Sequence, residues 1–462
     1  MHDVPTDPGA SLSAGRNVGM EDFENLLRTL MSPENASRGL AEQAYEKVKL
    51  ENPGMLLSCL GQTVRSCADP TLKAFSAVLL RRCAPETINA AATSDDAREL
   101  VKSSLLGSLQ EETERSIRTK VADTTGTIAF HLMNPRPDSG RAAGTWDELI
   151  PFLVQCCQSP SASHRESGLS IIGGLAQWLG DKLAPQGEAF KAIFAACLAD
   201  PGSGQVRLAA IEATCKFLPS LPDHALFADL LVPMVQVVTT ALGQGDEATA
   251  RAALEHLIEL VEDNNKFLRA RIADISAMAL QVCGTDTLDE GTRQLGMEFL
   301  VSVSEKSPGL VRKMNIVESL IPMCMQFMLT IEDDDEWETN DSGFEEDEDS
   351  ELYTAGEDAL YRISVSIGGN TVLPVLTGLV GGFVAHADWR NRLVGLMSVC
   401  QATEGCSKQL SDNLQDVVGV ALARFTDDHP RVRHAALHTL GTMAADFGPD
   451  LQEQFHQPIL TG

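Results

Sequence analysis

Aromatic side chains are scarce in this sequence. They make up 5% of the 462 residues, and only three of them are tyrosines. No stretch alternates apolar and polar residues as a half-buried β-strand requires, so folds built on sheets are not expected. The 11 cysteines form no C-x-x-C motif and no spacing suited to zinc. We therefore expect reduced thiols in an all-α protein of the cytoplasm and nucleus.

Motifs of catalysis and of metal or phosphate binding are missing as well. The sequence contains no G-x-x-x-x-G-K-[ST], no G-x-S-x-G and no H-E-x-x-H. His434 and His438 lie four residues apart, but no third metal ligand stands near them in sequence. Residues 202–207 lack the third glycine of a dinucleotide-binding loop and follow no predicted strand. We expect no enzymatic activity, no cofactor and no bound metal.

Long apolar runs and a secretory leader are also missing. The longest apolar run identified, residues 372–385, is interrupted by Pro374 and three glycines and is too short to cross a bilayer. The N-terminus has neither a basic start nor an apolar core, and we expect residues 1–20 to form a disordered tail. A formal net charge of -29 disfavours nucleic acid as a direct partner. We expect no membrane insertion.

A repeat with a period near 42 residues runs through the chain. A small residue followed by an apolar one recurs at Gly168-Leu169, Ala210-Ile211, Ala253-Leu254, Gly296-Met297, Gly395-Leu396 and Ala436-Leu437. An arginine stands three residues before the small one at Arg165, Arg207, Arg293, Arg392 and Arg433, whereas the third copy has Ala250 there. Helical spacing with such a period is typical of stacked helix pairs. The sequence therefore predicts an all-α superhelix, or solenoid, of roughly ten helix pairs.

Each part of the repeat has an expected role. The small residue lets two helix backbones approach closely, and the apolar residue after it fills the space between layers. The recurring arginine is expected to pair with a carboxylate of an adjacent repeat. In the last copy, Pro430 fits the first turn of a helix, and Asp427 and Asp428 stand where carboxylates complement the helix start.

The largest step between copies contains an acidic block, residues 332–351. It holds 13 carboxylates in 20 residues and no lysine or arginine. Such a charge density cannot form a packed layer by itself, so a solvated insertion loop is the simplest interpretation. Because the block carries Trp337 and Phe344 and interrupts a repeat array, we also consider a binding element for basic partners. Trp337 would then act as an apolar anchor, or else pack on its own solenoid.

The residues predicted to bind a partner are Glu332, Asp333, Asp334, Asp335, Glu336, Trp337, Glu345, Glu346 and Asp347. In this hypothesis the five residues 333–337 face the concave surface.

Several segments resemble the importin-β superfamily, and within it the importin beta-3 (importin-5) branch. They are the acidic block itself, A-G-E-D-A-L-Y-R-I-S-V-S-I-G-G (355–369), V-L-P-V-L (372–376), D-W-R-N-R (388–392), D-D-H-P-R-V-R-H-A-A (427–436) and M-A-A-D-F-G-P (443–449). Near the start, residues 30–46 and 77–82 resemble the N-terminal Ran-binding repeats of that family. The resemblance covers about residues 22–460.

This resemblance implies a nuclear transport receptor built from HEAT repeats, which shuttles between cytoplasm and nucleus. In that family the N-terminal repeats bind the small GTPase Ran in its GTP form, the inner surface holds basic cargo proteins, and grooves on the outer face take phenylalanine-glycine nucleoporins. Ran-GTP and cargo disfavour each other's binding, so the implied mechanism is a coupling free energy between two sites.

The implied organisation has five parts. They are a tail (1–20), Ran-binding-type HEAT repeats (21–130), further HEAT repeats (131–331), the acidic insertion (332–354), and HEAT repeats whose last copy is incomplete (355–462). Family members are roughly twice as long, so we expect a fragment or a truncated gene model.

Two other kinds of helical-repeat protein stay open. A scaffold of a phosphatase or another multiprotein complex would also be a HEAT solenoid, without Ran binding. A tubulin-binding array would use basic loop edges, which the acidic charge disfavours.

Overall fold

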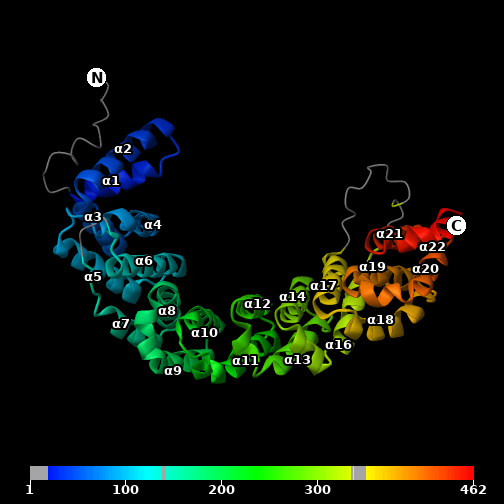
Figure 1. The fold of residues 1–462 in the computed structure, drawn as a ribbon. Helices are drawn as coiled ribbons and strands as arrows, with labels where there is room; N and C mark the ends of the chain where they lie inside the picture. Colours follow the sequence, from blue (N-terminus) through cyan, green and yellow to red (C-terminus); the bar gives the residue numbers. More distant parts are fainter. Residues whose placement is uncertain (1–18, 138–141, 334–336, 338–349, 462) are drawn as a thin grey trace. The chain divides into compact units, whose positions relative to one another are not determined.

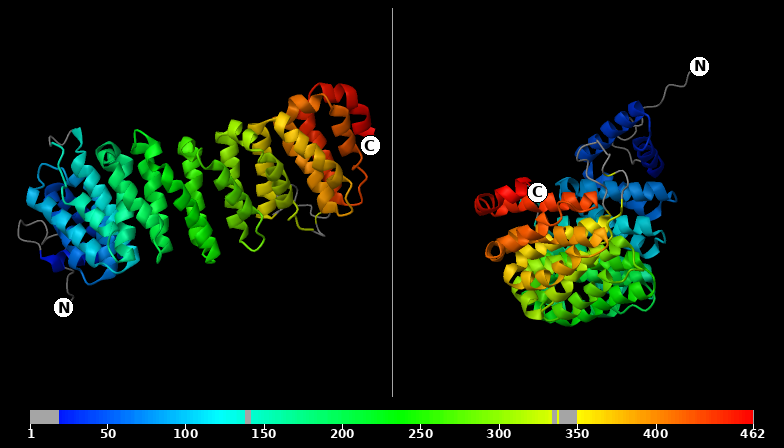
Figure 2. Two further views of the ribbon diagram at one scale, coloured as in Figure 1. Left: turned by 90° about the horizontal axis from the view of Figure 1, so that it is seen from below. Right: turned by 90° about the vertical axis from the view of Figure 1, so that its right-hand side faces the viewer.

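The computed structural model describes residues 19–137, 142–333, 337 and 350–461 (Figure 1). Over these ranges the chain forms 22 α-helices and no strand, as the repeat predicts. Contacts divide the helices into two compact units, Met1–Met234 and Val235–Gly462. Helix α11 (Leu231–Gly243) crosses this division. In each unit, successive helices lie side by side and stack in series (Figure 2).

The first unit is built from consecutive helix pairs. Its helices are α1 (Met20–Leu30), α2 (Asn35–Glu51), α3 (Pro53–Ser66), α4 (Pro70–Thr87), α5 (Asp95–Glu111), α6 (Arg115–Met133), α7 (Leu149–Cys157), α8 (Ala162–Leu183), α9 (Gly187–Leu198) and α10 (Gly204–Phe217). Helices α4, α6, α8 and α10 pack on one another in that order and form one layer. Their partners α3, α5, α7 and α9 form the second layer, so each pair buries its apolar stripe against the next.

The second unit repeats this arrangement. Its helices are α12 (Glu247–Leu268), α13 (Ile272–Cys283), α14 (Glu290–Lys306), α15 (Pro308–Met314), α16 (Val317–Met328), α17 (Glu351–Ile367), α18 (Gly369–Val384), α19 (Trp389–Ser411), α20 (Leu414–Leu422), α21 (Pro430–Asp446) and α22 (Asp450–Thr461). Helices α12, α14, α17, α19 and α21 pack in sequence, and we call them the B layer. Figure 1 draws the B layer on the upper side of this unit.

The recurring small residues bring paired helices together, as predicted. A Cβ atom at Gly168 of α8 would lie 2.8 Å from Cys157 Sγ of α7, and one at Gly395 of α19 would lie 2.7 Å from Val384 Cγ1 of α18. The apolar residues that follow are buried in five of the six copies, with exposed fractions of 0–2%. The prediction is wrong for Leu437, which is 56% exposed, because α21 is the last B-layer helix in the described ranges.

The recurring arginines pair across repeats at two positions. Arg165 Nε donates to Asp200 Oδ2 (2.8 Å), and Arg392 Nε donates to Asp427 Oδ2 (2.8 Å). In both cases the carboxylate follows the arginine by 35 residues and belongs to the next helix pair. The prediction is wrong for Arg293, which contacts Asp286 of its own pair (Nη2 to Oδ1, 3.1 Å).

One helical stretch is apolar enough to cross a membrane by length and composition alone. It is His224–Gly243, which joins a short 3-10 helix (His224–Leu230) to α11, and its mean hydropathy is 1.8. The sequence analysis identified residues 372–385 as the longest apolar run and did not identify residues 224–243. Its side chains Phe227, Leu230, Met234 and Val238 are fully or almost fully buried, so packing in the helical array accounts for its composition.

Candidate functional site

The acidic block leaves the solenoid and returns to it at one place. Thr330 Oγ1, two residues before the block, and Ser350 Oγ, in the next-to-last residue of the block, lie 2.6 Å apart. Ser350 also caps α17, because its hydroxyl accepts a hydrogen bond from the Tyr353 amide (3.2 Å). Helix α17 therefore begins at Glu351, four residues before the expected start of the following HEAT repeats at residue 355. The predicted residues Glu332, Asp333 and Trp337 are described; Asp334, Asp335, Glu336, Glu345, Glu346 and Asp347 lie outside the described residues.

The start of the block runs along the first turns of α19 and α21. Arg390 Nε donates to the carbonyl oxygen of Ile331 (3.0 Å), and Arg431 Nη1 donates to that of Glu332 (3.0 Å). Asp333 Oδ1 lies 3.3 Å from His429 Nε2. The start of the block thus meets two segments that lie 59 and 99 residues later in the sequence. The block is attached to two later repeats through its backbone and one carboxylate.

Trp337 packs on α21. Its ring meets His434 edge to face, with 5.4 Å between ring centroids, and the Arg431 guanidinium carbon lies 5.8 Å from the Trp337 ring centroid. Cation–π and edge-to-face contacts of this kind stabilise by about 0.5–1 kcal/mol at partly exposed sites. Of the two roles considered for Trp337, packing on its own solenoid is the one that this geometry favours.

A cavity of about 180 Å³ lies beneath Trp337. Three B-layer helices line it, through Tyr353 and Glu357 of α17, Leu393 and Met397 of α19, and Ala435 and His438 of α21. Besides these apolar side chains and the Glu357 carboxylate, the lining includes Arg431 and the rings of His434 and His438.

Further along the B layer, carboxylates gather around Arg362 of α17. Its guanidinium donates to both oxygens of Glu298 (2.8 and 3.0 Å) and to both oxygens of Glu305 (2.8 and 3.0 Å), which belong to α14. Asp358 Oδ2 accepts a longer hydrogen bond from the same group (3.3 Å). The hydrogen bonds from Arg362 hold the pKa of Glu305 below its usual value.

Between α17 and α19, carboxylates have neutral partners. Tyr361 donates its hydroxyl proton to Glu404 Oε2 (2.7 Å), and Gln401 Nε2 donates to Glu357 Oε1 (2.6 Å). The hydrogen bond to Glu404 and the nearby negative charges of Glu404, Asp446 and Asp358 raise the pKa of Tyr361. The sequence analysis predicted neither the carboxylates around Arg362 nor those between α17 and α19. Residues 355–369 were used there only for their resemblance to a family, and nothing in that segment indicated contacts with residues 43 to 64 positions away.

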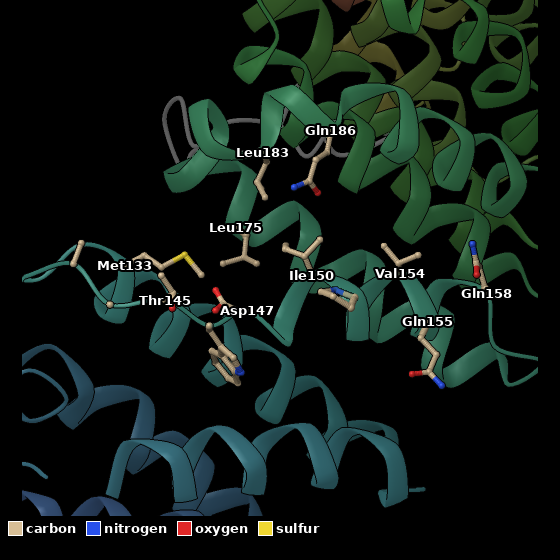
Figure 3. Close-up of a pocket in the computed structure, with 14 residues that line it drawn as sticks. Met133, Thr145, Asp147, Ile150, Val154, Gln155, Gln158, Leu175, Leu183 and Gln186 are labelled. Carbon is tan, nitrogen blue, oxygen red and sulfur yellow. The ribbon is translucent and has the colours of Figure 1, made fainter. Parts of the chain in front are cut away.

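Three other hollows are present in the described parts of the units. One of about 660 Å³ lies between α12, α14 and α17 and includes Glu255, Glu298, Glu351 and Asp358. An apolar groove of about 240 Å³ lies between α18, α19 and α20. In the first unit, a cavity of about 1000 Å³ is formed by the end of α6, α7 and α8, with Met133, Ile150, Val154, Leu175 and Leu183 around it (Figure 3).

The structure offers no sign of metal or thiol chemistry in the ranges that it describes. No group of three or more potential metal ligands occurs among those residues. All 11 cysteines are free, and ten of them are buried. Burial raises the pKa of Cys59, Cys156, Cys197 and Cys406 to about 11, so these thiols are protonated at neutral pH.

Comparison with known proteins gives consistent matches. A family model described as "IPO5-like, TPR repeats" matches residues 113–278, and one described as "Importin repeat" matches residues 285–374. Importin subunit beta-3 of Saccharomyces cerevisiae is 26% identical over 452 residues, which cover 94% of this chain and 40% of the relative. The crystal structures of Kap121p bound to Pho4p and to RanGTP superpose with TM-scores of 0.85 and 0.83 at 25% identity. Each covers 95% of this chain and 42% or 41% of the other. The chain spans about 40% of the length of the curated relatives that it matches.

Proposed function

The chain belongs to the importin-β superfamily, and from this we propose that it acts as a nuclear transport receptor of the importin beta-3 kind. It would bind basic cargo in the cytoplasm, pass the nuclear pore and release the cargo when Ran-GTP binds in the nucleus. The observation that carries the proposal is the likeness to importins over more than nine-tenths of the chain. The crystal structures of Kap121p with Pho4p and with RanGTP support it, because they come from a protein of the same fold.

The B layer of the second unit is the proposed cargo surface. Glu404 and Asp446 are exposed there, and their negative charge attracts basic segments over about 8 Å at physiological ionic strength. In the 180 Å³ cavity, Leu393 and Met397 would contact the aliphatic part of a lysine while Glu357 accepts its ammonium group. Glu332, Asp333 and Trp337 stand beside this cavity, so the acidic block would add charge to the same surface. The other predicted residues of the block are included in the proposed cargo surface only because they carry negative charge.

The proposed Ran-GTP site lies on the first helices. The family-like residues 30–46 span the end of α1 and most of α2, and residues 77–82 belong to α4. Helix α2 exposes Leu40 and Leu50, which are large apolar side chains on an otherwise charged helix. Exposed apolar side chains within a polar surface are typical of protein contacts.

The groove between α18 and α20 is the proposed contact for phenylalanine-glycine nucleoporins. Leu376 and Val380 line it from α18, and Val417 and Val420 line it from α20. It is almost wholly apolar and of a size that suits one aromatic ring.

A Ran-binding assay on the 462-residue chain tests the proposal. We expect Ran loaded with a non-hydrolysable GTP analogue to bind and Ran-GDP to bind much more weakly. Bound Ran-GTP should also weaken the binding of a basic peptide, because coupling between two sites is reciprocal. If the chain binds neither form of Ran and binds phosphatase subunits instead, the scaffold alternative is the correct one.

A further inference from the structure

Arg362 makes the densest set of ion pairs on the B layer. Four of its hydrogen bonds, of 2.8–3.0 Å, reach the two α14 carboxylates Glu298 and Glu305. Paired forks of this type are the geometry in which an arginine binds two carboxylates most specifically. The guanidinium therefore occupies both α14 carboxylates and offsets one of their two negative charges. Glu298 and Asp358 also border the 660 Å³ hollow between α12, α14 and α17, so Arg362 offsets part of the negative charge of that wall too.

These ion pairs are accessible to water. The side chain of Arg362 is 25% exposed, and those of Glu298 and Glu305 are 39% and 35% exposed. Ion pairs at this exposure are screened by water, so even in bidentate geometry each is expected to contribute on the order of 1 kcal/mol to stability. An arginine or lysine from another protein could reach the same carboxylates if Arg362 were absent.

The α19 side of the layer differs in its partners. Glu404 accepts a hydrogen bond from the neutral Tyr361 hydroxyl, and no described cation forms an ion pair with it. The hydroxyl orients the carboxylate without cancelling its charge. Asp446 of α21 is exposed and lies near enough to influence Tyr361. From α17 toward α21, the B layer therefore presents carboxylates whose charge no described arginine or lysine offsets through an ion pair.

We propose that Arg362 is a specificity-determining residue that occupies the α14 carboxylates and confines basic partners to the part of the B layer between α17 and α21. The inference rests on the proposed function, since it concerns where a basic segment binds. Arg362 occupies the position beside Glu298 and Glu305 that a basic side chain of a partner would otherwise take, if the partner's segment were longer or bound further along the layer. A partner with few positive charges, placed beside Glu404, is then preferred over polybasic segments that spread along the layer.

The test uses the full chain and a fluorescein-labelled nonalysine peptide at low salt. Arg362→Gln should bind the peptide about three- to thirtyfold more tightly than the wild type, because two carboxylates become available at a few tenths to 1 kcal/mol each. Its affinity should also fall more steeply with added salt. The triple variant Glu298→Gln/Glu305→Gln/Arg362→Gln should return to the wild-type affinity, which a merely structural role of Arg362 would not produce.

Arg271→Gln is the matched control. It removes the same charge from the same unit, but its partner Asp274 belongs to α13, outside the B layer. This variant should change peptide affinity by less than about twofold, since both charges are well exposed. Circular dichroism of each variant verifies that the helices are retained.

The outcomes separate this inference from the proposed function. If the wild type binds the peptide and Arg362→Gln binds no better, the inference is overturned and the proposed function stands. If only Arg362→Gln binds, the inference stands and the basic-cargo part of the proposed function fails. If neither binds, both are overturned, because the uncovered carboxylates then attract no basic segment.

Discussion

Replacing Asp427 by asparagine should destabilise the second unit more than any other single charge removal on it. Asp427 is 2% exposed and pairs through both oxygens with Arg392, which is 8% exposed (2.7 and 2.8 Å). Burial alone would raise the pKa of Asp427, but the hydrogen bonds from Arg392 and from the His429 amide outweigh it and lower the pKa from 3.8 to about 2. The predicted helix-capping carboxylate is thus mainly the partner of an arginine, and His429 occupies the cap position of α21.

Two estimates give the size of the effect. A pKa lowered from 3.8 to about 2 corresponds to about 2–3 kcal/mol of stability at neutral pH. Removing one member of a buried pair costs about 3–5 kcal/mol in general. In this variant, Arg392 would keep its hydrogen bonds to the exposed Asp428 and to the carbonyl groups of His386 and Ala387. The cost of Asp427→Asn should therefore lie near the lower end of that range. We expect a loss of about 3 kcal/mol.

Asp428→Asn is the matched control. Asp428 Oδ1 accepts from the same Arg392 Nη2 (2.8 Å), but its side chain is 92% exposed. Its removal should cost less than about 1 kcal/mol. Because helical repeats unfold in parts, hydrogen exchange of amides in α19 and α21 is the appropriate measurement.

The pH dependence provides an independent check. Since the pKa of Asp427 is lower in the folded state, its contribution is complete above about pH 5 and disappears as the pH falls toward about 2. The stability difference between wild type and Asp427→Asn should therefore shrink over this interval. A difference that stays constant with pH, or an Asp428→Asn variant that is equally unstable, would refute the reasoning.

Three further predictions concern other parts of the chain. Trp337→Ala should lower exchange protection in α21 by about 1 kcal/mol, because its contacts with Arg431 and His434 are lost; unchanged protection would mean that the tryptophan does not hold the block. Gly405→Ala should cost about 3 kcal/mol in urea unfolding, because a Cβ there would overlap the Ser364 carbonyl of α17, whereas Gly419→Ala, with no atom within 4 Å, should stabilise by about 0.5–1 kcal/mol. Val420→Glu should weaken the binding of a phenylalanine-glycine peptide by about tenfold or more, since it puts a charge into the α18–α20 groove; equal affinity would remove that groove from the proposal.

The sequence was sufficient for the features that depend on one repeat and its neighbour. The helical spacing of the apolar residues alone predicts that Val432, Ala436, Leu440 and Met443 are buried, and all four are buried. A small residue at a fixed phase predicts close approach of paired helices, because only a missing side chain leaves room for the facing helix. This holds at Gly168 and Gly395.

Contacts between distant repeats could not be predicted in this way. Periodicity fixes which face of a helix a residue occupies, but not how far along the next helix its side chain reaches. Arg362 meets Glu305 and Glu298 at separations of 57 and 64 residues, and Asp333 meets His429 at 96. None of these separations is a multiple of the period. The sequence therefore predicts an acidic candidate surface, but not the contacts between side chains that shape it.

The insertion explains how a regular array can carry an irregular segment. Because Thr330 and Ser350 touch, the block enters and leaves one helix pair at a single point, and α16 still packs on α17 as any other pair does. The entropy of closing such a loop grows only slowly with its length, so the array tolerates it at small cost. The contacts of Ile331, Glu332 and Asp333 with α19 and α21 add a second attachment, two repeats further on. Replacing residues 338–349 by a Gly-Ser linker of equal length should therefore leave stability unchanged. Replacing 332–351, with glycine at position 350, removes the side-chain contacts of Asp333 and Trp337 and the Ser350 cap, and should cost about 1–2 kcal/mol. Equal stability of the two variants in urea would mean that these contacts do not hold the block. If both keep the affinity for nonalysine, the acidic block contributes nothing to the proposed cargo surface.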